Sequence, residues 1–371
     1  MTKEELISKI KEAADAYYSG RELMSDKEYD ALIEELRTVD SDNPIIAGLA
    51  GDEDEQEANA AGYPKIKHRL TTGTLSKAMT LEVFEKWVKS HKGPYHVSDK
   101  MDGAGSELVY EDGKLVHLIS RGNGYYGYDK LALAKYLPIP TDLPGLKDKI
   151  SIRGEFELSN AAFNSHNCFK DMKNPRNAGS GLLNKKVDDL TAEEIDAMKE
   201  LKFFAYDILL EKEFSSKDHK SVIFQLLKDM GFETPVNKVC QTYDEVIQFR
   251  EGRSKIRGTD AEEFATDGIV VFEERLDAKD QLEKIQKKAI AIKYDLMVAE
   301  GTILDIEWSM AGAYLTPVAI MTPMELDGTT VQRANLCNLN IISKLGIKIG
   351  DKVRVAKMGE IIPAILAKVT N

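Results

Sequence analysis

Hydrophobic positions near the N-terminus recur every three or four residues, the spacing that forms one face of a helix. One stripe runs from Leu6 to Tyr17, and a second runs from Tyr29 to Leu36. A hydroxyl residue followed three positions later by glutamate precedes each stripe, and such a pair caps the start of a helix. The pattern predicts two N-terminal helices and a third helix over residues 80–91.

Apolar and polar positions alternate after Pro94, as they do in strands. Asp112-Gly113 separates two alternating runs and predicts a hairpin. The other strands predicted from this pattern are residues 151–158, 201–210 and 266–272. A helical pattern over residues 220–252 separates the last two of these strands. From Ala299 onward, short strands and turns predict a small β-barrel.

The composition fits a folded, water-soluble chain. Its 371 residues are 43% hydrophobic and 30% charged, and a chain of this length usually forms two or three domains. The sequence contains neither an apolar run of about 18 residues, the length that spans a bilayer, nor a secretory signal core at its start. We therefore expect no membrane association and a cytoplasmic location, in a bacterium or, for a viral protein, in its host cell.

Cysteine and charge patterns narrow the picture further. Cys168, Cys240 and Cys337 are far apart and lack the C-x-x-C spacing of a zinc site, which fits a reducing compartment. The net charge of −12 argues against a nucleic-acid partner when it is read as an average. Basic residues nevertheless cluster at Lys185-Lys186 and along residues 344–357, so a local basic face that binds DNA remains open.

Lys100-Met101-Asp102-Gly103 is the most informative short string. A lysine two residues before Asp-Gly matches the K-x-D-G pattern, in which nucleotidyltransferases form a covalent lysine–AMP. An attacking lysine must be neutral, and burial or neighbouring cations favour that form. Taken alone, the string is more often a surface lysine in a turn.

Four further charged residues follow Lys100 in an order that suits the same chemistry: Arg121, Glu155, Asp267 and Lys293. Glu155 and Asp267 lie at strand ends, where a carboxylate can bind a ribose hydroxyl or a divalent cation. Lys293 ends an apolar strand, and a charge in such a place usually has a partner, for which a phosphate is suited. Each residue alone could be an ordinary solvated side chain, whereas the ordered series favours a nucleotide site.

Strings along nearly the whole chain resemble those of the bacterial NAD-dependent DNA ligases. Residues 17–30 resemble the helical domain that binds the nicotinamide mononucleotide (NMN) half of NAD. Residues 174–178 (NPRNA) are similar to a specific family string, and residues 203–207 (FFAYD) resemble the strand whose aromatic residue stacks on adenine. Strings between Thr316 and Pro363 resemble the oligonucleotide-binding (OB) barrel of these ligases.

The resemblance implies a multidomain α+β protein. The expected domains are a helical NMN-binding domain (residues 1–66), a nucleotidyltransferase (ATP-grasp-like ligase) domain of antiparallel sheets and helices (67–296) and an OB-fold β-barrel (297–371). The N-terminal helical piece distinguishes NAD-dependent ligases from ATP-dependent ligases and capping enzymes, which share K-x-D-G.

The resemblance also implies a reaction in three steps. The lysine attacks the α-phosphorus of NAD, which releases NMN and leaves lysyl-AMP. AMP then moves to the 5′-phosphate of a nick in double-stranded DNA. The 3′-hydroxyl displaces AMP and seals the strand. NAD and Mg²⁺ (or Mn²⁺) are the expected cofactors, and nicked duplex DNA is the expected partner.

The resemblance implies a role for each residue at a matching position. The implied catalytic residues are Lys100 as the nucleophile, with Asp102, Arg121, Glu155, Asp267 and Lys293. Of these, Lys100, Arg121, Glu155 and Lys293 also contact the cofactor, and Glu155 and Asp267 are the implied Mg²⁺ ligands. The other implied cofactor contacts are Tyr17, Tyr18, Asp26, Tyr29 and Asp30 for NMN, Ser76, and Tyr206 stacked on adenine. The implied DNA contacts are Arg176, Lys185 and Lys186. For Tyr17 and Tyr29, simple core packing is the alternative.

The chain departs from the family at the adenine pocket. Ser98 stands where the family carries a glutamate, and Phe272 stands where it carries a lysine. Losing one of the two would leave the other buried and unpaired, at a cost of about 1–3 kcal/mol, whereas losing both is internally consistent. We therefore expect adenine to be held mainly by stacking and shape. A family arginine is also replaced within residues 309–312 (SMAG), so we expect one DNA phosphate contact to be missing.

The chain stops just after the barrel, and we expect the zinc, helix-hairpin-helix and BRCT domains of the family to be absent from it. This fits a compact ligase such as a virus carries, a truncated form, or one subunit of a split enzyme. We expect adenylation by NAD to survive in this chain alone, and nick sealing to be weak or to need a partner chain. The alternatives are an ATP-dependent ligase or capping-type enzyme, and a ligase-like binding subunit that no longer catalyses.

Overall fold

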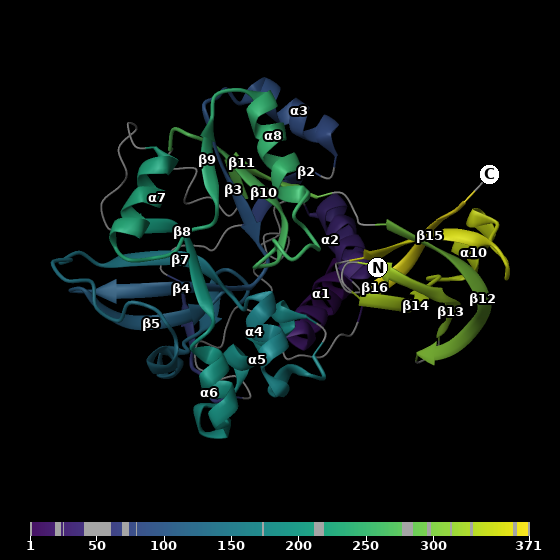
Figure 1. Cartoon of the computed structure of the whole chain (residues 1–371), viewed down its shortest axis with the longest axis horizontal. Coiled ribbons are helices and arrows are strands. Elements are labelled where there is room, and N and C mark those ends of the chain that lie inside the picture. Colours follow the sequence, from purple (N-terminus) through teal and green to yellow (C-terminus); the bar gives the residue numbers. More distant parts are fainter. Residues whose placement is uncertain are drawn as a thin grey trace. The chain divides into compact units, whose positions relative to one another are not determined.

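The computed structural model divides into two compact units, Met1–Lys293 and Tyr294–Asn371 (Figure 1). The residues that the structure describes are 2–18, 24, 26–40, 61–68, 74–78, 80–172, 174–210, 219–276, 285–294, 298–311, 314–326, 329–358 and 362–369. The domain boundary expected at residue 66 stays a prediction.

Two helices form the start of the chain, as predicted. They are α1 (Lys3–Tyr18) and α2 (Asp26–Val39). The capping box before α1 is confirmed, because Glu5 N donates to Thr2 Oγ1 while Thr2 N donates to the Glu5 carboxylate. The second predicted capping box begins at Ser25, which lies outside the described residues. Among the described side chains of these two helices, Leu6, Ile10 and Leu36 are fully buried.

A five-stranded sheet forms one half of the larger unit. In spatial order its strands are β2 (Thr74–Ala78), β11 (Ile285–Lys293), β10 (Thr266–Glu273), β3 (Tyr95–Met101) and β9 (Asn237–Cys240). Only the β2–β11 pair among these is parallel. Helices α3 (Leu81–Ser90) and α8 (Tyr243–Ser254) contact this sheet (Figure 1). The helix predicted over residues 80–91 is thereby confirmed.

A four-stranded antiparallel sheet forms the other half. Its order is β5 (Lys114–Ser120), β4 (Ala104–Glu111), β7 (Ile150–Glu157) and β8 (Lys202–Leu210). The predicted hairpin joins β4 to β5 through Asp112 and Gly113, with φ of 48° and 76°. Both residues are in the left-handed region that two-residue hairpin turns require. A short pair, β1 (Lys65–Lys67) and β6 (Tyr126–Tyr128), lies outside both sheets.

Shorter helices pack on the four-stranded sheet and complete its hydrophobic core. They are η1 (Leu131–Tyr136), α4 (Asn160–Ser165), η2 (Asn167–Phe169), α5 (Pro175–Asn184), η3 (Val187–Asp189), α6 (Ala192–Met198) and α7 (Lys220–Asp229). Helix α5 contacts β4 and β7, and α7 contacts β8. The Phe224 ring of α7 also lies 4.3 Å from the His96 ring of β3, so α7 touches both sheets.

The single helical stretch predicted over residues 220–252 is wrong in its middle. The structure has two helices, α7 and α8, with strand β9 between them. Gly231 ends the first helix with φ of 88°, a conformation that glycine adopts without strain. Pro235 then prevents a helix from continuing. The segment that follows pairs with the edge of β3 instead.

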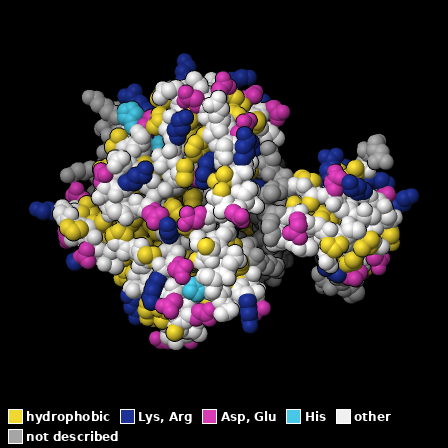
Figure 2. Space-filling model, in the orientation of Figure 1, with side chains coloured by type: hydrophobic (Ala, Val, Ile, Leu, Met, Phe, Trp, Pro, Cys, Tyr) yellow, Lys and Arg dark blue, Asp and Glu magenta, His cyan; other side chains and the backbone are white. Residues whose placement is uncertain are grey.

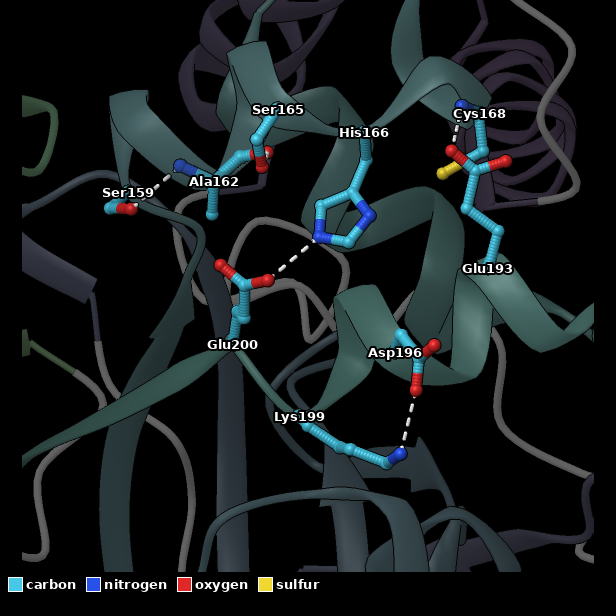
Figure 3. A network of polar contacts seen from close by, with 9 residues as sticks. All are labelled: Ser159, Ala162, Ser165, His166, Cys168, Glu193, Asp196, Lys199 and Glu200. Atoms are coloured by element: carbon cyan, nitrogen blue, oxygen red, sulfur yellow. Dashed lines mark hydrogen bonds and ion pairs between the residues drawn. The ribbon is translucent and has the colours of Figure 1, made fainter.

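A network of polar contacts ties the α4–η2 segment to α6 (Figure 3). His166 Nε2 lies 2.8 Å from the Glu200 carboxylate, and the backbone N–H of Cys168 donates to Glu193. At the start of α4, Ser159 Oγ accepts from Ala162 N and caps the helix. These contacts are partly exposed, so they fix local geometry more than they add stability.

The second unit is a closed five-stranded barrel, as predicted for the tail. Its order is β12 (Val298–Ala311), β13 (Tyr314–Leu326), β14 (Thr329–Asn335), β16 (Ile362–Lys368) and β15 (Lys352–Met358). Helix α10 (Leu339–Leu345) begins at the N-cap Asn338 and ends at Gly346, whose φ is 59°. The barrel interior is filled by apolar side chains such as Ile303, Met321, Val353 and Val355.

Gly268 allows three strands of the first sheet to approach closely. It faces Lys100 on β3 and Lys293 on β11 in the strand register. A Cβ at this position would lie 2.2 Å from the carbonyl oxygen of Ile292. Any side chain would therefore push β11 away from β10.

We predict that Gly268→Ala destabilises the chain by about 1–3 kcal/mol, the usual cost of an overpacked interior. Gly252→Ala is the matched control, because its Cβ would meet no atom within 4 Å and alanine favours the helix by about 0.5–1 kcal/mol. Urea unfolding measures both variants. Equal stability of the two would contradict the prediction.

Candidate active site

A cavity of about 320 Å³ lies between the two sheets of the larger unit. Residues directly opposite each other in an antiparallel pair share a face of the sheet, which explains its lining. The residues that the first sheet contributes include Ser98, Lys100, Val270, Phe272, Ala291 and Lys293. The residues that the second sheet contributes include Gly105, Arg153, Glu155, Tyr206 and Asp207. The K-x-D-G lysine and three of the four charged residues that follow it are therefore on strands that face one cavity.

Asp267 joins the two lysines of the predicted series. Lys100 Nζ donates to Asp267 Oδ2 at 2.9 Å, and Lys293 Nζ lies 3.0 Å from the same oxygen. The Asp267 side chain is only 5% exposed, so its charge depends on these partners. The carboxylate of Asp267 therefore lies between the ammonium groups of Lys100 and Lys293.

A shift in strand register gives Asp267 this position. Thr266 pairs with Met101, and Gly268 pairs with Lys100, so Asp267 is an extra residue in β10. Such a bulge redirects a side chain that regular alternation would send elsewhere. Asp267 can therefore reach Lys100 although Gly268, its neighbour, is the residue in register with that lysine.

Glu155 and Arg121 meet above Gly105. Gly105 pairs with Glu155 in the strand register, and Arg121 N donates to the Gly105 carbonyl oxygen at 2.9 Å. Burial raises the pKa of Glu155 to about 7, against the opposing influence of the Arg121 and Lys100 charges. The Glu155 carboxyl is therefore readily protonated in the absence of a ligand.

His68 supports this corner and is not among the residues predicted from the sequence. Its Nδ1 lies 2.5 Å from the Glu107 carboxylate, and its Nε2 lies 3.0 Å from the carbonyl oxygen of Arg121. His68 and Glu107 are both buried. This buried pair holds the backbone of Arg121 in place at the cavity wall.

A second register shift, in β8, brings two successive residues to the cavity. Gly154 pairs with Ala205 and Arg153 pairs with Asp207, which leaves Tyr206 as the extra residue. Tyr206 and Asp207 both line the cavity as a result. Burial raises the pKa of Tyr206 further above its usual value, so the phenol is neutral and suited to stacking on a base.

The two family departures, Ser98 and Phe272, lie on the same wall. Asp99, next to Ser98, does not substitute for the missing glutamate, because Arg253 Nε donates to both of its oxygens at 2.8 and 2.9 Å. Lys220, from the start of α7, also lines this wall and bonds Asp207 Oδ1 at 2.9 Å. No sequence signal singles out Lys220, since its position depends on how α7 packs on β8.

Asp102 and Arg176 form an ion pair at the cavity, with Asp102 Oδ1 and Arg176 Nη1 2.7 Å apart. Asp102 is one of the implied catalytic residues, and in the structure it forms an ion pair with Arg176. Ser76 is exposed on β2, and the cavity lining includes its neighbours Leu75 and Lys77 rather than Ser76 itself.

The remaining predicted contact residues are not part of the cavity lining or lie outside the described residues. Lys185 is ion-paired with Glu194, and Lys186 is exposed; neither is part of the cavity lining. Tyr29 is half-buried against the core of α1 and α2. The side chains of Tyr17, Tyr18, Asp26 and Asp30 lie outside the described residues, so the NMN contacts stay predictions.

Among the described residues, no group of three or more histidine, cysteine, aspartate or glutamate side chains could hold a metal ion. No helix in the described part of the chain is long and apolar enough to cross a membrane. On the face shown in Figure 2, lysine and arginine side chains are scattered among aspartate and glutamate rather than gathered in one basic patch.

Comparison with known families decides what this arrangement belongs to. A family model for the NAD-dependent DNA ligase adenylation domain matches residues 60–296, and one for the NAD-dependent DNA ligase OB-fold domain matches residues 300–371. The chain belongs to the NAD-dependent DNA ligase family. The resemblance inferred from the motifs is thereby confirmed, and the closed barrel is the OB-fold domain of a NAD-dependent DNA ligase.

Relatives agree with this assignment. The chain is 34% identical to the DNA ligase of Treponema denticola, over 98% of this chain and 56% of that protein. It is 32% identical to the DNA ligase of Lachnoclostridium phytofermentans, over 99% of this chain and 56% of that protein. The chain thus spans about half the length of these ligases.

Among solved structures, a Lig E DNA ligase, described as binding DNA with a minimal scaffold, covers 81% of this chain and 100% of its own. The TM-score is 0.47 and the identity is 11%, a likeness too low to add to the assignment of this NAD-dependent ligase chain.

We predict that Glu155→Gln changes how folding stability depends on pH. The pKa of Glu155 is raised from 4.5 to about 7 in the folded chain. Between these values the folded state holds a proton that the unfolded state has released, so wild-type stability falls as pH rises through this window. Glutamine has no such proton, so the stability of the variant relative to wild type should rise by about 2–3 kcal/mol between roughly pH 4 and pH 8.

Urea unfolding at both ends of the window measures this difference. Glu263→Gln, at an exposed glutamate, is the control and should track wild type at both pH values. A Glu155→Gln variant that also tracks wild type would contradict the prediction.

Proposed function

We propose that Lys100 attacks the α-phosphorus of NAD and forms a covalent lysyl-AMP. The observation that carries this proposal is the cluster of Lys100, Asp267 and Lys293 on the wall of the cavity. A bond forms between Lys100 Nζ and phosphorus, the bond from phosphorus to the NMN phosphate oxygen breaks, and its electron pair leaves with NMN. The cavity volume of about 320 Å³ is within the range of small-ligand pockets.

Asp267 has two tasks in this proposal. Lys100 Nζ must lose a proton before it attacks, and the Asp267 carboxylate at 2.9 Å can accept it. Once protonated, Asp267 no longer neutralises Lys293, whose ammonium lies 3.0 Å away. The positive charge of Lys293 then serves the phosphate on which negative charge develops, the form of electrostatic stabilisation that enzymes use most.

The other lining residues bind the rest of the nucleotide. We assign Arg121 and Glu155 to the ribose and Tyr206 to stacking on adenine, since all three line the cavity. Asp102 and Arg176 flank the reacting phosphates as an ion pair. The helical segment, residues 1–66, binds the NMN half of NAD. Its proposed contacts are Tyr17, Tyr18, Asp26, Tyr29 and Asp30.

Mg²⁺ or Mn²⁺ fits this site as an ion held largely by the substrate. Magnesium typically binds one or two carboxylates and completes its shell with phosphates and water. The described residues agree, because they offer Glu155 and Asp267 at the cavity but no larger group of ligands. Glu155 is the better candidate, since Asp267 already bonds two lysines. When bound, the ion would neutralise charge on the NAD phosphates.

The later steps involve DNA. We propose that AMP passes from Lys100 to the 5′-phosphate of a nick and that the 3′-hydroxyl then displaces it, with Arg176, Lys185 and Lys186 and the OB-fold domain on the DNA. We place this reaction in the cytoplasm. The net charge of −12 and the ion pair of Lys185 with Glu194 weaken the attraction to phosphates that dominates DNA affinity. A partner chain that binds DNA would strengthen this attraction.

We predict that wild type incubated with NAD and Mg²⁺ gains the mass of AMP on Lys100, and that Lys100→Arg gains none. Arginine keeps the positive charge beside Asp267 but cannot become a neutral nucleophile. Intact-protein and peptide mass spectrometry measure the adduct. Lys89→Arg, at an exposed lysine of α3, is the control and should be adenylated normally. Adduct formation with ATP instead of NAD would favour the ATP-dependent alternative, and no adduct with either nucleotide would favour a binding subunit.

We predict that the purified chain seals nicked duplex DNA slowly although it is adenylated readily. The reason is weak electrostatic attraction to DNA, so sealing should improve as salt is lowered. A gel assay of nicked substrate over time, at two salt concentrations, measures this against the adenylation rate. Sealing that keeps pace with adenylation at physiological salt would contradict the prediction.

A further inference from the structure

Lys220 carries a buried charge that faces the nucleotide cavity. It is the first residue of α7, its side chain is 1% exposed, and it is part of the cavity lining. Lysine is almost never fully buried unless it is paired. Its described hydrogen-bond partner is Asp207, whose Oδ1 accepts from Nζ at 2.9 Å.

The surroundings hold this ammonium in one place. The N-terminus of a helix is the positive end of its dipole and disfavours a cation, so Lys220 depends on compensation from outside α7. Asp207 provides it from β8, where the register shift at Tyr206 directs Asp207 into the cavity. The Phe272 ring on β10 adds a second contact, with its centroid 4.4 Å from Nζ, well within the range of cation–π attraction.

Lys220 therefore offers a fixed hydrogen-bond donor at the cavity wall. An ammonium has three donor hydrogens and no acceptor, and Asp207 Oδ1 engages one of them. The nearby His96 is not part of the cavity lining, and its ring is neutral because burial and the Lys220 charge lower its pKa to about 3. Ser98, Val270 and Tyr206 line the same cavity, so a base stacked on Tyr206 would lie in the cavity that Lys220 also lines.

We infer that Lys220 is the residue that recognises adenine, by donating a hydrogen bond to ring nitrogen N1, and that Asp207 positions it. The inference rests on the proposed function, since adenine enters the cavity as part of NAD. It replaces the expectation that adenine is held mainly by stacking and shape. Position 272 carries no charged donor in this sequence. Lys220 of α7 provides one nearby, with its Nζ 4.4 Å from the centroid of the Phe272 ring.

Adenine and hypoxanthine differ at the atom that Lys220 would contact. N1 of adenine is an acceptor, whereas N1 of hypoxanthine carries a hydrogen and is a donor. Two donors facing each other leave both unpaired, which a buried site rejects strongly. Wild type should therefore form its lysyl adduct faster with NAD than with nicotinamide hypoxanthine dinucleotide.

The test compares adduct formation on Lys100 with these two dinucleotides. In Lys220→Met, the preference for NAD should fall by roughly 10- to 100-fold, the usual loss when a hydrogen bond to a charged donor is removed. Lys228→Met, at an exposed lysine of the same helix, should keep the wild-type preference. Lys220→Met with Phe272→Lys returns an ammonium to the same region and should restore part of the preference.

Folding is controlled by a further variant. Lys220→Met alone leaves the buried Asp207 carboxylate without the ammonium that it pairs with. A double variant, Lys220→Met with Asp207→Asn, removes both charges together. Thermal unfolding selects the variants that are folded. An unchanged preference for NAD in the folded double variant would overturn the inference while leaving the proposed adenylation intact. Absence of any adduct in wild type would overturn the proposed function, and the inference with it.

Discussion

The arrangement of the site depends on one carboxylate shared by two lysines. Asp267 contacts Lys100 on β3 and Lys293 on β11 from its own position on β10. Three neighbouring strands are therefore linked by charge at the point where they face the cavity. Because Asp267 is almost fully buried, its negative charge must be compensated by the two lysines. In the proposed reaction, the contact that holds Lys100 in place is also the one that would take its proton.

Two extra residues in the strands make this arrangement possible. Strands present successive side chains to opposite faces, so a regular β10 or β8 would bring only every second residue to the cavity. The shift at Asp267 and the shift at Tyr206 break this alternation. As a result Tyr206 and Asp207, which are adjacent in sequence, both reach the cavity. Bulges are frequent beside active sites for this reason.

Features encoded locally could be predicted from the sequence, and features that depend on packing could not. The hairpin at Asp112-Gly113 and the capping box at Thr2 follow from a few neighbouring residues. The charged series from Lys100 to Lys293 could be recognised because each member sits in its own short string. Lys220 was missed because nothing in its string distinguishes it from a solvated helix lysine. Its burial follows from contacts with Asp207 on β8 and Phe272 on β10, which depend on how α7 packs on the two sheets. The register shifts escaped prediction for the same reason.

The cavity is lined by two different sheets, and this has a consequence for the lifetime of the protein. Lys100 and Phe272 line it from one sheet, and Glu155 and Tyr206 line it from the other, so a nucleotide bound there would join two layers of the fold. A reversible ligand stabilises a protein only while its concentration stays high. AMP attached covalently to Lys100 does not dissociate, and its support would persist after NAD has gone. The chain would then exist in two forms, with and without AMP on Lys100. The adenylated form would resist unfolding and proteolysis for longer.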